Sequence, residues 1–276
     1  MDEVLALRDY LYERTGLYLP NSRRYMFEGR FLARMEAVGL ANLGQYLAYL
    51  RKEEKSNGEL TCLLNELAVG ALSFFADPVR FRALGEVFIP DLVRRDKDRS
   101  KELVVWCLGC GTGQETYAAA MVMHQLQQTS LQGWNCLAWG TDRSVSAIAA
   151  AREGVYAEFA LRGVPRSLLE QYLVPGQGQV RVSQHLKSMV RFDQFDVARL
   201  PTAVPENKVD IIFSCCELAH FDRQERGKMV EALHRTLRDG GYLVLGNLES
   251  LHGLRDGFRL VHFPGGFAYR KLLNSG

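Results

Sequence analysis

Three closely spaced glycines stand at the start of LGCGTGQETYAAAM, residues 108–121. Gly109, Gly111 and Gly113 permit a sharp turn and let the backbone come close to a ligand. A dinucleotide-binding loop has the spacing G-x-G-x-x-G and holds pyrophosphate at a helix N-terminus. This loop has G-x-G-x-G, with Gln114 at the position of the third fingerprint glycine. A turn without a ligand is disfavoured, because glycines before a helix weaken folding. The segment therefore predicts a binding loop that departs from the pyrophosphate pattern.

Two acidic residues accompany the loop. Asp142 ends the apolar run that begins at Cys136, and a carboxylate there can accept hydrogen bonds from both hydroxyl groups of a ribose. Loop and acid together predict an adenosine cofactor at the carboxyl ends of strands. The G-x-G-x-G spacing resembles the loop that wraps S-adenosylmethionine in class I methyltransferases. Glu115 opens the following helix, where it either complements the helix dipole or binds the methionyl ammonium of the cofactor.

The elements that must position these residues are buried strands alternating with helices. Four apolar runs predict strands: ELVVWCLG, CLAWGTD, VDIIFSCCE and GYLVLGN. Three helical patterns lie between them: ETYAAAMVMHQLQ, SVSAIAAAREG and RQERGKMVEALHRTLRDG. This alternation predicts a doubly wound, mostly parallel α/β sheet. Phe258–His262 and Gly266–Lys271, separated by a turn, predict a closing hairpin.

Two further regions flank this sheet. Residues 1–95 have helical spacing, with apolar stripes such as Val4, Leu7, Tyr10 and Leu11, and predict an all-α domain and a joining segment. Residues 96–276 form the predicted cofactor-binding domain, which begins in the charged stretch RRDKDRSKE. Residues 156–192 break the strand–helix rhythm and predict a small β insertion, placed in the second half of the sheet, with a Gly-Gln-Gly turn.

Composition excludes several classes of protein. The chain has 276 residues, 47% hydrophobic and 24% charged, with a net charge of +2. This balance suits a globular core and provides no global field for nucleic acid or membrane. No apolar run approaches the roughly 18 residues of a transmembrane helix, and the acidic amphipathic start is unlike a signal peptide. We therefore expect a cytoplasmic protein whose six cysteines are reduced thiols.

Taken in order along the chain, these motifs resemble those of CheR-type chemotaxis receptor methyltransferases. The segments that carry the resemblance are LYERTGLYLP, RRYMFEGRFLARMEAVGL, QYLAYL, SFFADPVRFRAL, FIPDLV, VVWCLGCGTGQETYAAAM, GTDRS, AREGVY, VRFDQFDV, VDIIFSCCELAHFD and GGYLVLGNLESL. The resemblance implies a Rossmann-like class I methyltransferase sheet behind an all-α domain. It also implies an enzyme that uses S-adenosylmethionine to methylate glutamate side chains in the cytoplasmic helical region of a chemoreceptor, releasing S-adenosylhomocysteine.

The resemblance also implies roles for individual residues. The cofactor-binding positions are Gly109, Gly111, Gly113, Glu115, Asp142, Arg143, Asp196, Val197 and Cys216. Asp196 and Val197 replace an Asn-Leu pair beside the adenine. Arg23, Arg30 and Arg34 share one helical face and, by this resemblance, belong to the helix that contacts acidic receptor helices; a solvated face is the alternative.

Departures from the family pattern lie on the acceptor side. The joining segment of the family usually has the pattern Asn-x-Thr-x-Phe-Phe-Arg, and Gly70, Leu72 and Ala76 replace its polar members here. Cys215 and Cys216 replace an Arg-Asn pair after the fourth predicted strand, and His220 replaces a tyrosine. His220 is either a substitute hydrogen-bond donor or a packed side chain.

Three functions follow, in order of preference. The first is a protein-glutamate O-methyltransferase. The second is a catalytically weak or inactive relative that binds the cofactor as a sensor or scaffold. The third, disfavoured by the loop spacing, is a nucleotide-dependent oxidoreductase. A separate and less favoured hypothesis is a metal or redox site, in which Cys107, Cys110, Cys215 and Cys216 converge near the cofactor.

Overall fold

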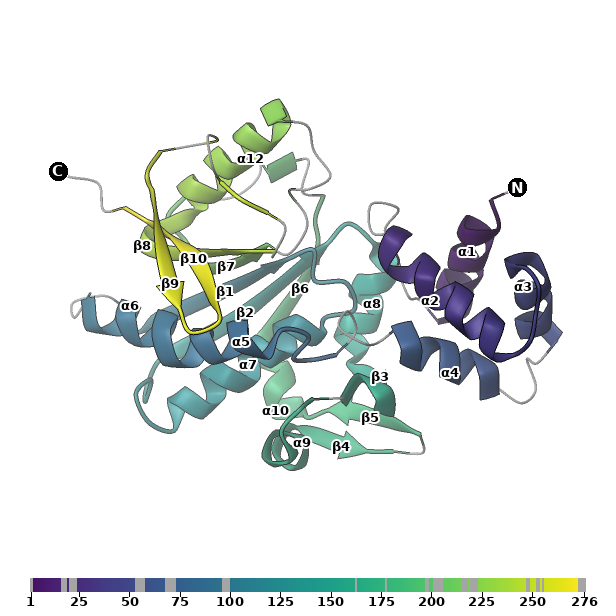
Figure 1. The fold of residues 1–276 in the computed structure, drawn as a ribbon. Coiled ribbons are helices and arrows are strands. Elements are labelled where there is room, and N and C mark those ends of the chain that lie inside the picture. The colour runs from purple at the N-terminus through teal and green to yellow at the C-terminus, as the bar shows by residue number, and fades with distance from the viewer. Residues whose placement is uncertain are drawn as a thin grey trace.

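The computed structural model describes residues 2–15, 19, 24–52, 58–67, 73–95, 100–161, 163–176, 178–196, 199–200, 206–214, 218, 223–246, 249–251, 254 and 256–272. Within these residues no helix combines the length and the apolar character needed to cross a bilayer. A bundle of helices occupies one end of the molecule, and a large sheet with helices on both faces forms most of the rest, with a smaller sheet beside it (Figure 1).

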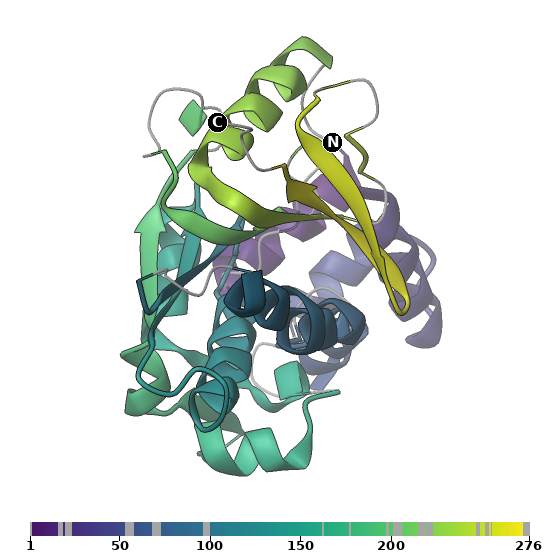
Figure 2. The same cartoon turned by 90° about the vertical axis from the view of Figure 1, so that its left-hand side faces the viewer.

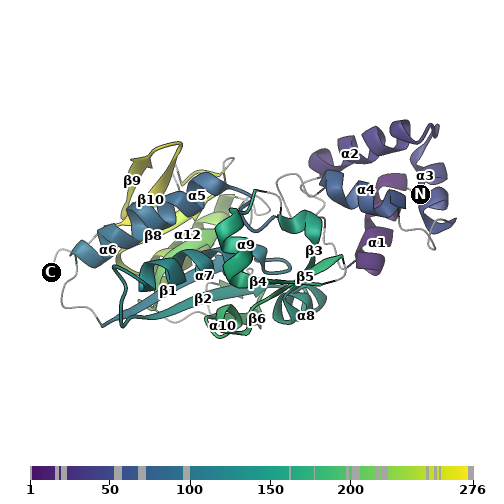
Figure 3. The ribbon, with the colours of Figure 1, turned by 90° about the horizontal axis from the view of Figure 1, so that it is seen from below.

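The N-terminal bundle consists of α1 (Glu3–Thr15), α2 (Arg24–Ala37), α3 (Leu43–Lys52) and α4 (Gly58–Leu67). The stripe predicted on the first helix is confirmed, because Val4, Leu7, Tyr10 and Leu11 are all buried. Phe27, Phe31 and Met35 of α2 join the same core, which is separate from the cores of the sheet. Figure 3 shows the bundle standing to the side of the sheet.

The main sheet has the strand order β6-β2-β1-β7-β8-β10-β9. Its strands are β1 (Glu102–Leu108), β2 (Asn135–Asp142), β6 (Val190–Gln194), β7 (Val209–Ser214), β8 (Leu237–Leu245), β9 (Phe258–Phe263) and β10 (Gly266–Lys271). Pairing is parallel from β6 through β8, and β10 is antiparallel to both β8 and β9. The predicted parallel sheet and closing hairpin are thereby confirmed.

Helices cover the sheet on both faces. The side chains of β1 alternate, so that Val105 and Cys107 join one core while Trp106 and Leu108 join the other. The first core contains residues of α7 (Gln114–Gln127) and α8 (Val145–Glu153), and the second contains residues of α12 (Arg223–Thr236). Figure 2 shows α12 on the opposite side of the sheet from α7.

The joining segment packs onto the sheet. It contains α5 (Pro78–Ala83), the π-helix η3 (Leu84–Phe88) and α6 (Ile89–Arg95). Phe81 stacks on Phe213 of β7 at a ring-centroid distance of 5.6 Å, and Phe88 stacks on Tyr242 of β8 at 4.7 Å. These stacked rings fix the joining segment against β7 and β8, the strands next to β1 on one side of the sheet.

The predicted β insertion is a three-stranded sheet of order β3-β5-β4. It comprises β3 (Val155–Ala157), the 3-10 helix η4 (Glu158–Leu161), α9 (Arg166–Tyr172), β4 (Leu173–Pro175), β5 (Gln179–Val182) and α10 (Gln184–Lys187). The amide of Gly176 donates to the carbonyl of Gln179 at 2.8 Å and closes the predicted turn. Its predicted placement in the second half of the sheet was wrong. The insertion precedes β6, a short edge strand that pairs with β2, so it interrupts the first half.

A buried carboxylate organises the N-terminal bundle. Glu59 of α4 accepts hydrogen bonds from Arg34 Nε at 3.0 Å, from Arg34 Nη2 at 2.6 Å and from the Tyr46 hydroxyl at 2.6 Å. The hydrogen bonds from Arg34 to Glu59 raise the pKa of the guanidinium, and burial raises the pKa of Tyr46. Arg34 therefore joins α2 to α4 in addition to its place on the arginine face.

Replacing Glu59 by alanine is expected to lower the free energy of unfolding of the bundle by about 2–3 kcal/mol, because Arg34 and Tyr46 lose their common acceptor. Glu28→Ala is the matched control, since Glu28 pairs with the more exposed Arg24, and such a pair contributes less than about 1 kcal/mol. Urea unfolding followed by circular dichroism measures both. Equal losses in the two variants would contradict a structural role for the Glu59 cluster.

Candidate functional site

The glycine loop leaves β1 at the point where the sheet reverses its winding. β1 and β7 are neighbours, and Leu108 pairs with Ser214 at their carboxyl ends. The chain continues from β1 into α7 on one face, and the next helix described after β7 is α12 on the other (Figure 2). In open α/β sheets ligands bind in the crevice that forms at such a switch point.

Left-handed backbone conformations shape the loop. Gly109, Gly111 and Gly113 have φ values of 71°, 54° and 92°, a region that glycine adopts without strain. The amides of Gly109 and Cys110 both donate to the carbonyl of Thr141, at 2.8 and 2.9 Å. The loop is therefore bonded directly to the end of β2, where the predicted ribose acid stands.

The Asp142 carboxylate links the two loops. Its Oδ2 accepts from the amide of Gly111 at 2.9 Å, and its Oδ1 accepts from the amide of Ser144 at 2.8 Å. Each oxygen of a carboxylate can accept two hydrogen bonds, and the described part of the chain uses one on each. Asp142 is 9% exposed. Its orientation is thus fixed by backbone groups while acceptor capacity remains on both oxygens.

The three loop glycines have different surroundings. A Cβ on Gly113 would lie 2.8 Å from Ala151 Cβ and 2.8 Å from Phe192 Cζ, so this glycine is required for packing. A Cβ on Gly111 would have no atom within 4 Å among the described residues. The space beside Gly111 is therefore open to a ligand, and the loop fits a cofactor that lies against the backbone and reaches the Asp142 carboxylate.

A buried thiol lies close to the two predicted cofactor acids. Glu115 is half-buried in the first turn of α7, and Cys110 is buried just before it. Burial raises the pKa of the Cys110 thiol, and the nearby Asp142 and Glu115 carboxylates raise it further. Among the described residues no group of three His, Cys, Asp or Glu side chains is arranged to hold a metal. Cys215 and Cys216 lie outside those residues, so the four-thiol hypothesis is only half described.

The remaining predicted site residues are described only in part. Arg143 follows Asp142, and its carbonyl accepts from Gln194 Nε2 at 3.2 Å. Asp196 is exposed just after Phe195, whose amide donates to the carbonyl of Asp142 at 2.9 Å, so Asp196 lies near the end of β2. Outside the described residues lie Arg23, Gly70, Leu72, Val197, Cys216 and His220.

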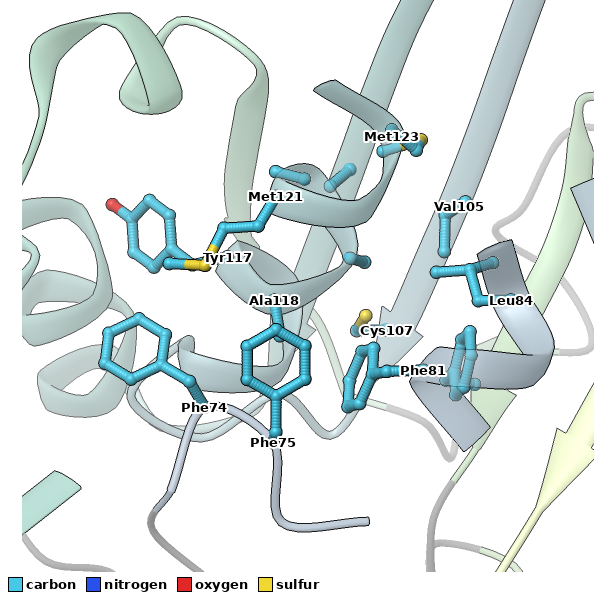
Figure 4. Close-up of a cluster of buried hydrophobic side chains, with 14 of the residues drawn as sticks. Phe74, Phe75, Phe81, Leu84, Val105, Cys107, Tyr117, Ala118, Met121 and Met123 are labelled. Carbon is cyan, nitrogen blue, oxygen red and sulfur yellow. The ribbon is translucent and has the colours of Figure 1, made fainter. Parts of the chain in front are cut away.

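The joining segment passes close to α7. Figure 4 shows Phe74 and Phe75 pointing toward the helix turn that carries Tyr117 and Ala118. Ala76 follows and is exposed, so the position of the family arginine lies on the surface and carries only a methyl group. Near it, Arg80 Nε lies 3.0 Å from Asp77 Oδ2.

Two tyrosines at the site lie in motifs quoted above, Tyr12 in LYERTGLYLP and Tyr156 in AREGVY, but neither is predicted from the sequence to have a role at the site. The hydroxyl of Tyr12, on α1 of the bundle, hydrogen-bonds to the hydroxyls of Ser144 and Ser146 at the start of α8, and these bonds lower its pKa. The hydroxyl of Tyr156, on β3, donates to the carbonyl of Thr112 at 2.7 Å. Both contacts join residues far apart in the chain, so local spacing gives no signal for them.

Comparison with known proteins gives matches over most of the chain. The family model described as "CheR methyltransferase, SAM binding domain" matches residues 71–267, and "CheR methyltransferase, all-alpha domain" matches residues 2–68. The chemotaxis protein methyltransferase of Escherichia coli is 29% identical over 272 residues, covering 94% of this chain and 91% of that protein. Chemotaxis protein methyltransferase 2 of Vibrio cholerae is 27% identical over 275 residues, covering 98% and 92%.

Among solved structures, the crystal structure of DszA carbon methyltransferase is 15% identical with a TM-score of 0.45, covering 86% of this chain and 55% of that chain. The matches to the family models confirm the predicted all-α and Rossmann-like parts and identify S-adenosylmethionine as the cofactor.

Alanine substitutions at two loop glycines are expected to separate folding from binding. Gly113→Ala places a methyl group against Ala151 and Phe192, and is expected to cost about 2–4 kcal/mol of stability. Gly111→Ala meets open space and is expected to cost only about 1–2 kcal/mol, from its positive φ. Gly111→Ala is nevertheless expected to weaken binding of S-adenosylhomocysteine at least tenfold. Unfolding and calorimetry measure the two effects, and full affinity in Gly111→Ala would contradict the assigned ligand space.

Proposed function

Because the chain belongs to the CheR methyltransferase family, we propose that it transfers methyl groups from S-adenosylmethionine to glutamate side chains of a chemoreceptor. The observation that carries the proposal is the Asp142 carboxylate, held by the amides of Gly111 and Ser144 beside an open glycine loop. The relatives from Escherichia coli and Vibrio cholerae have the printed name chemotaxis protein methyltransferase. The acceptor is then the cytoplasmic helical region of the receptor, and the enzyme acts in the cytoplasm.

In this proposal the free acceptor sites of Asp142 bind the ribose hydroxyls. The backbone at Gly109, Gly111 and Gly113 lies along the cofactor, and Glu115 binds its ammonium group. Asp196 accepts from the exocyclic amine of the adenine. The proposed set of cofactor-binding residues also includes Arg143, Val197 and Cys216.

The acid–base demands of the reaction are small. When bound, S-adenosylmethionine supplies an activated methyl group on a positively charged sulfur. A glutamate side chain has a pKa near 4.3 and is already ionised at neutral pH, so the chain needs no general base. Its residues must instead hold a carboxylate oxygen of the acceptor in line with the methyl group and the sulfur of the cofactor, and exclude water. We assign His220 as the hydrogen-bond donor that orients the carboxylate.

The acceptor approaches from the side of the N-terminal bundle. Tyr12 of α1 contacts Ser144, whose amide binds Asp142, so the bundle lies beside the proposed ribose site. We propose that Arg23 and Arg30 contact acidic positions of the receptor helix. Arg34 contributes charge to the same face while its guanidinium binds Glu59.

A catalytically weak or inactive relative that binds the cofactor as a sensor or scaffold is the second candidate. The observation that favours it is the exposed methyl group of Ala76 at the position of the family arginine. An arginine can hold a carboxylate in a bidentate pair, which alanine cannot. If this alignment lowers the activation free energy by about 3 kcal/mol, its loss would slow methyl transfer roughly a hundredfold.

Transfer of radiolabelled methyl groups to a chemoreceptor fragment is expected to give base-labile esters, as required for methylated carboxylates. Asp142→Asn is expected to abolish most transfer and to weaken S-adenosylhomocysteine binding at least tenfold, because an amide group replaces one acceptor oxygen. Asp193→Asn is the control, since Asp193 lies on β6 and binds Trp139 Nε1.

The wild-type result separates the two candidates. Cofactor binding without transfer to the receptor fragment would favour the sensor or scaffold. Absence of cofactor binding, or full affinity in Asp142→Asn, would contradict the proposed cofactor site.

Charge reversal at Arg30 is expected to weaken receptor binding about fivefold at low salt, because it replaces attraction to an acidic helix by repulsion. Lys52→Glu makes the same charge change at the exposed end of α3 and serves as the control. Surface plasmon resonance at two salt concentrations measures the effect. Equal affinities of Arg30→Glu and the wild type at low salt would remove the arginine face from the acceptor site.

A further inference from the structure

The β insertion makes a direct contact with the glycine loop. Tyr156 lies on β3, where it pairs with Val180 of β5, and its hydroxyl donates to the carbonyl of Thr112 at 2.7 Å. Thr112 stands between Gly111 and Gly113, the residues with positive φ at the centre and end of the loop. A side chain of the insertion therefore holds the middle of the loop at Thr112, one residue after the glycine whose amide binds Asp142.

The environment of Tyr156 keeps this hydrogen bond in place. The side chain is buried, and its ring packs edge-on against Phe74 of the joining segment, at a centroid distance of 5.0 Å, and against Tyr117 of α7, at 6.2 Å. Burial raises the pKa of Tyr156 well above its usual value. The hydroxyl thus stays protonated and remains a donor over the physiological pH range.

Fixing the Thr112 carbonyl fixes the peptide plane between Thr112 and Gly113. The amide of that plane belongs to Gly113 and donates to the carbonyl of Cys110 at 2.9 Å. On the other side of Thr112, the amide of Gly111 donates to Asp142. The hydrogen bond from Tyr156 to Thr112 therefore lies between two hydrogen bonds that define the loop conformation. One runs from the Gly113 amide to Cys110, and the other runs from the Gly111 amide to Asp142, the proposed ribose acid.

We propose that Tyr156 is a positioning residue, through which the β insertion holds the glycine loop in the conformation that binds the cofactor. This inference rests on the proposed cofactor site at the loop. It gives the insertion a role in cofactor affinity in addition to any contact with the acceptor. Phe74 takes part in this arrangement, because its ring packs on the same tyrosine from the joining segment.

The test compares two tyrosine-to-phenylalanine variants of the full chain. Tyr156→Phe keeps the packed ring and removes only the donor to Thr112. Tyr172→Phe is the matched control, because Tyr172 is also buried in the insertion and its hydroxyl hydrogen-bonds to His124 Nδ1 at 2.7 Å, away from the loop. Calorimetry with S-adenosylhomocysteine measures the dissociation constant, and hydrogen exchange without ligand measures the protection of the Gly111 and Gly113 amides.

Tyr156→Phe is expected to raise the dissociation constant about fivefold, since a buried hydrogen bond contributes about that factor, and to accelerate exchange of both amides. Tyr172→Phe is expected to leave both measurements unchanged. Equal effects in the two variants, or wild-type affinity and exchange in Tyr156→Phe, would overturn the proposal. If the wild type itself failed to bind S-adenosylhomocysteine, the cofactor site would be wrong, while the exchange measurement would still decide whether Tyr156 holds the loop.

Discussion

The hydrogen bond from the Gly111 amide to the Asp142 carboxylate is the constraint on which the site depends. It joins the loop after β1 to the loop after β2 at the carboxyl edge of the sheet. Parallel pairing in register brings those strand ends together, with Leu108 opposite Thr141. The carbonyl of Thr141 then accepts the amides of Gly109 and Cys110. The geometry of the loop thus follows from strand register and three positive φ values.

Several parts of the molecule are attached to this pair of loops. Ser144 caps α8 through its hydroxyl and binds Asp142 through its amide, so the acid and the helix start share one residue. Tyr12 reaches Ser144 from the N-terminal bundle, and Tyr156 reaches Thr112 from the insertion. Elements that the chain order separates therefore meet at the same two loops.

Sequence patterns predicted those features that are local. Apolar runs such as VDIIFSCCE indicated the buried strands, and the glycine spacing with Asp142 indicated the loop and its acid. Contacts between distant residues left no such pattern. The need for glycine at 140, for example, arises because Phe192 of β6 packs where a Cβ would stand, 2.6 Å away. The Arg34–Glu59 pair joins residues 25 apart in the chain, and the arginine spacing alone indicated only a charged face. The insertion was assigned to the wrong half of the sheet because β6 is a short strand with alternating burial.

The electrostatics of the loop favour a positively charged ligand. Asp142 and Glu115 both act on the Cys110 thiol, where their negative charges disfavour the thiolate. Glu115 lies in the first turn of α7, where the helix dipole favours negative charge. A ligand with an ammonium group and a positively charged sulfur would carry charge opposite to that of the two carboxylates. Glu115 stands in the first turn of α7, where a dinucleotide-binding loop holds pyrophosphate, so its negative charge disfavours an anionic group there, in agreement with the glycine spacing.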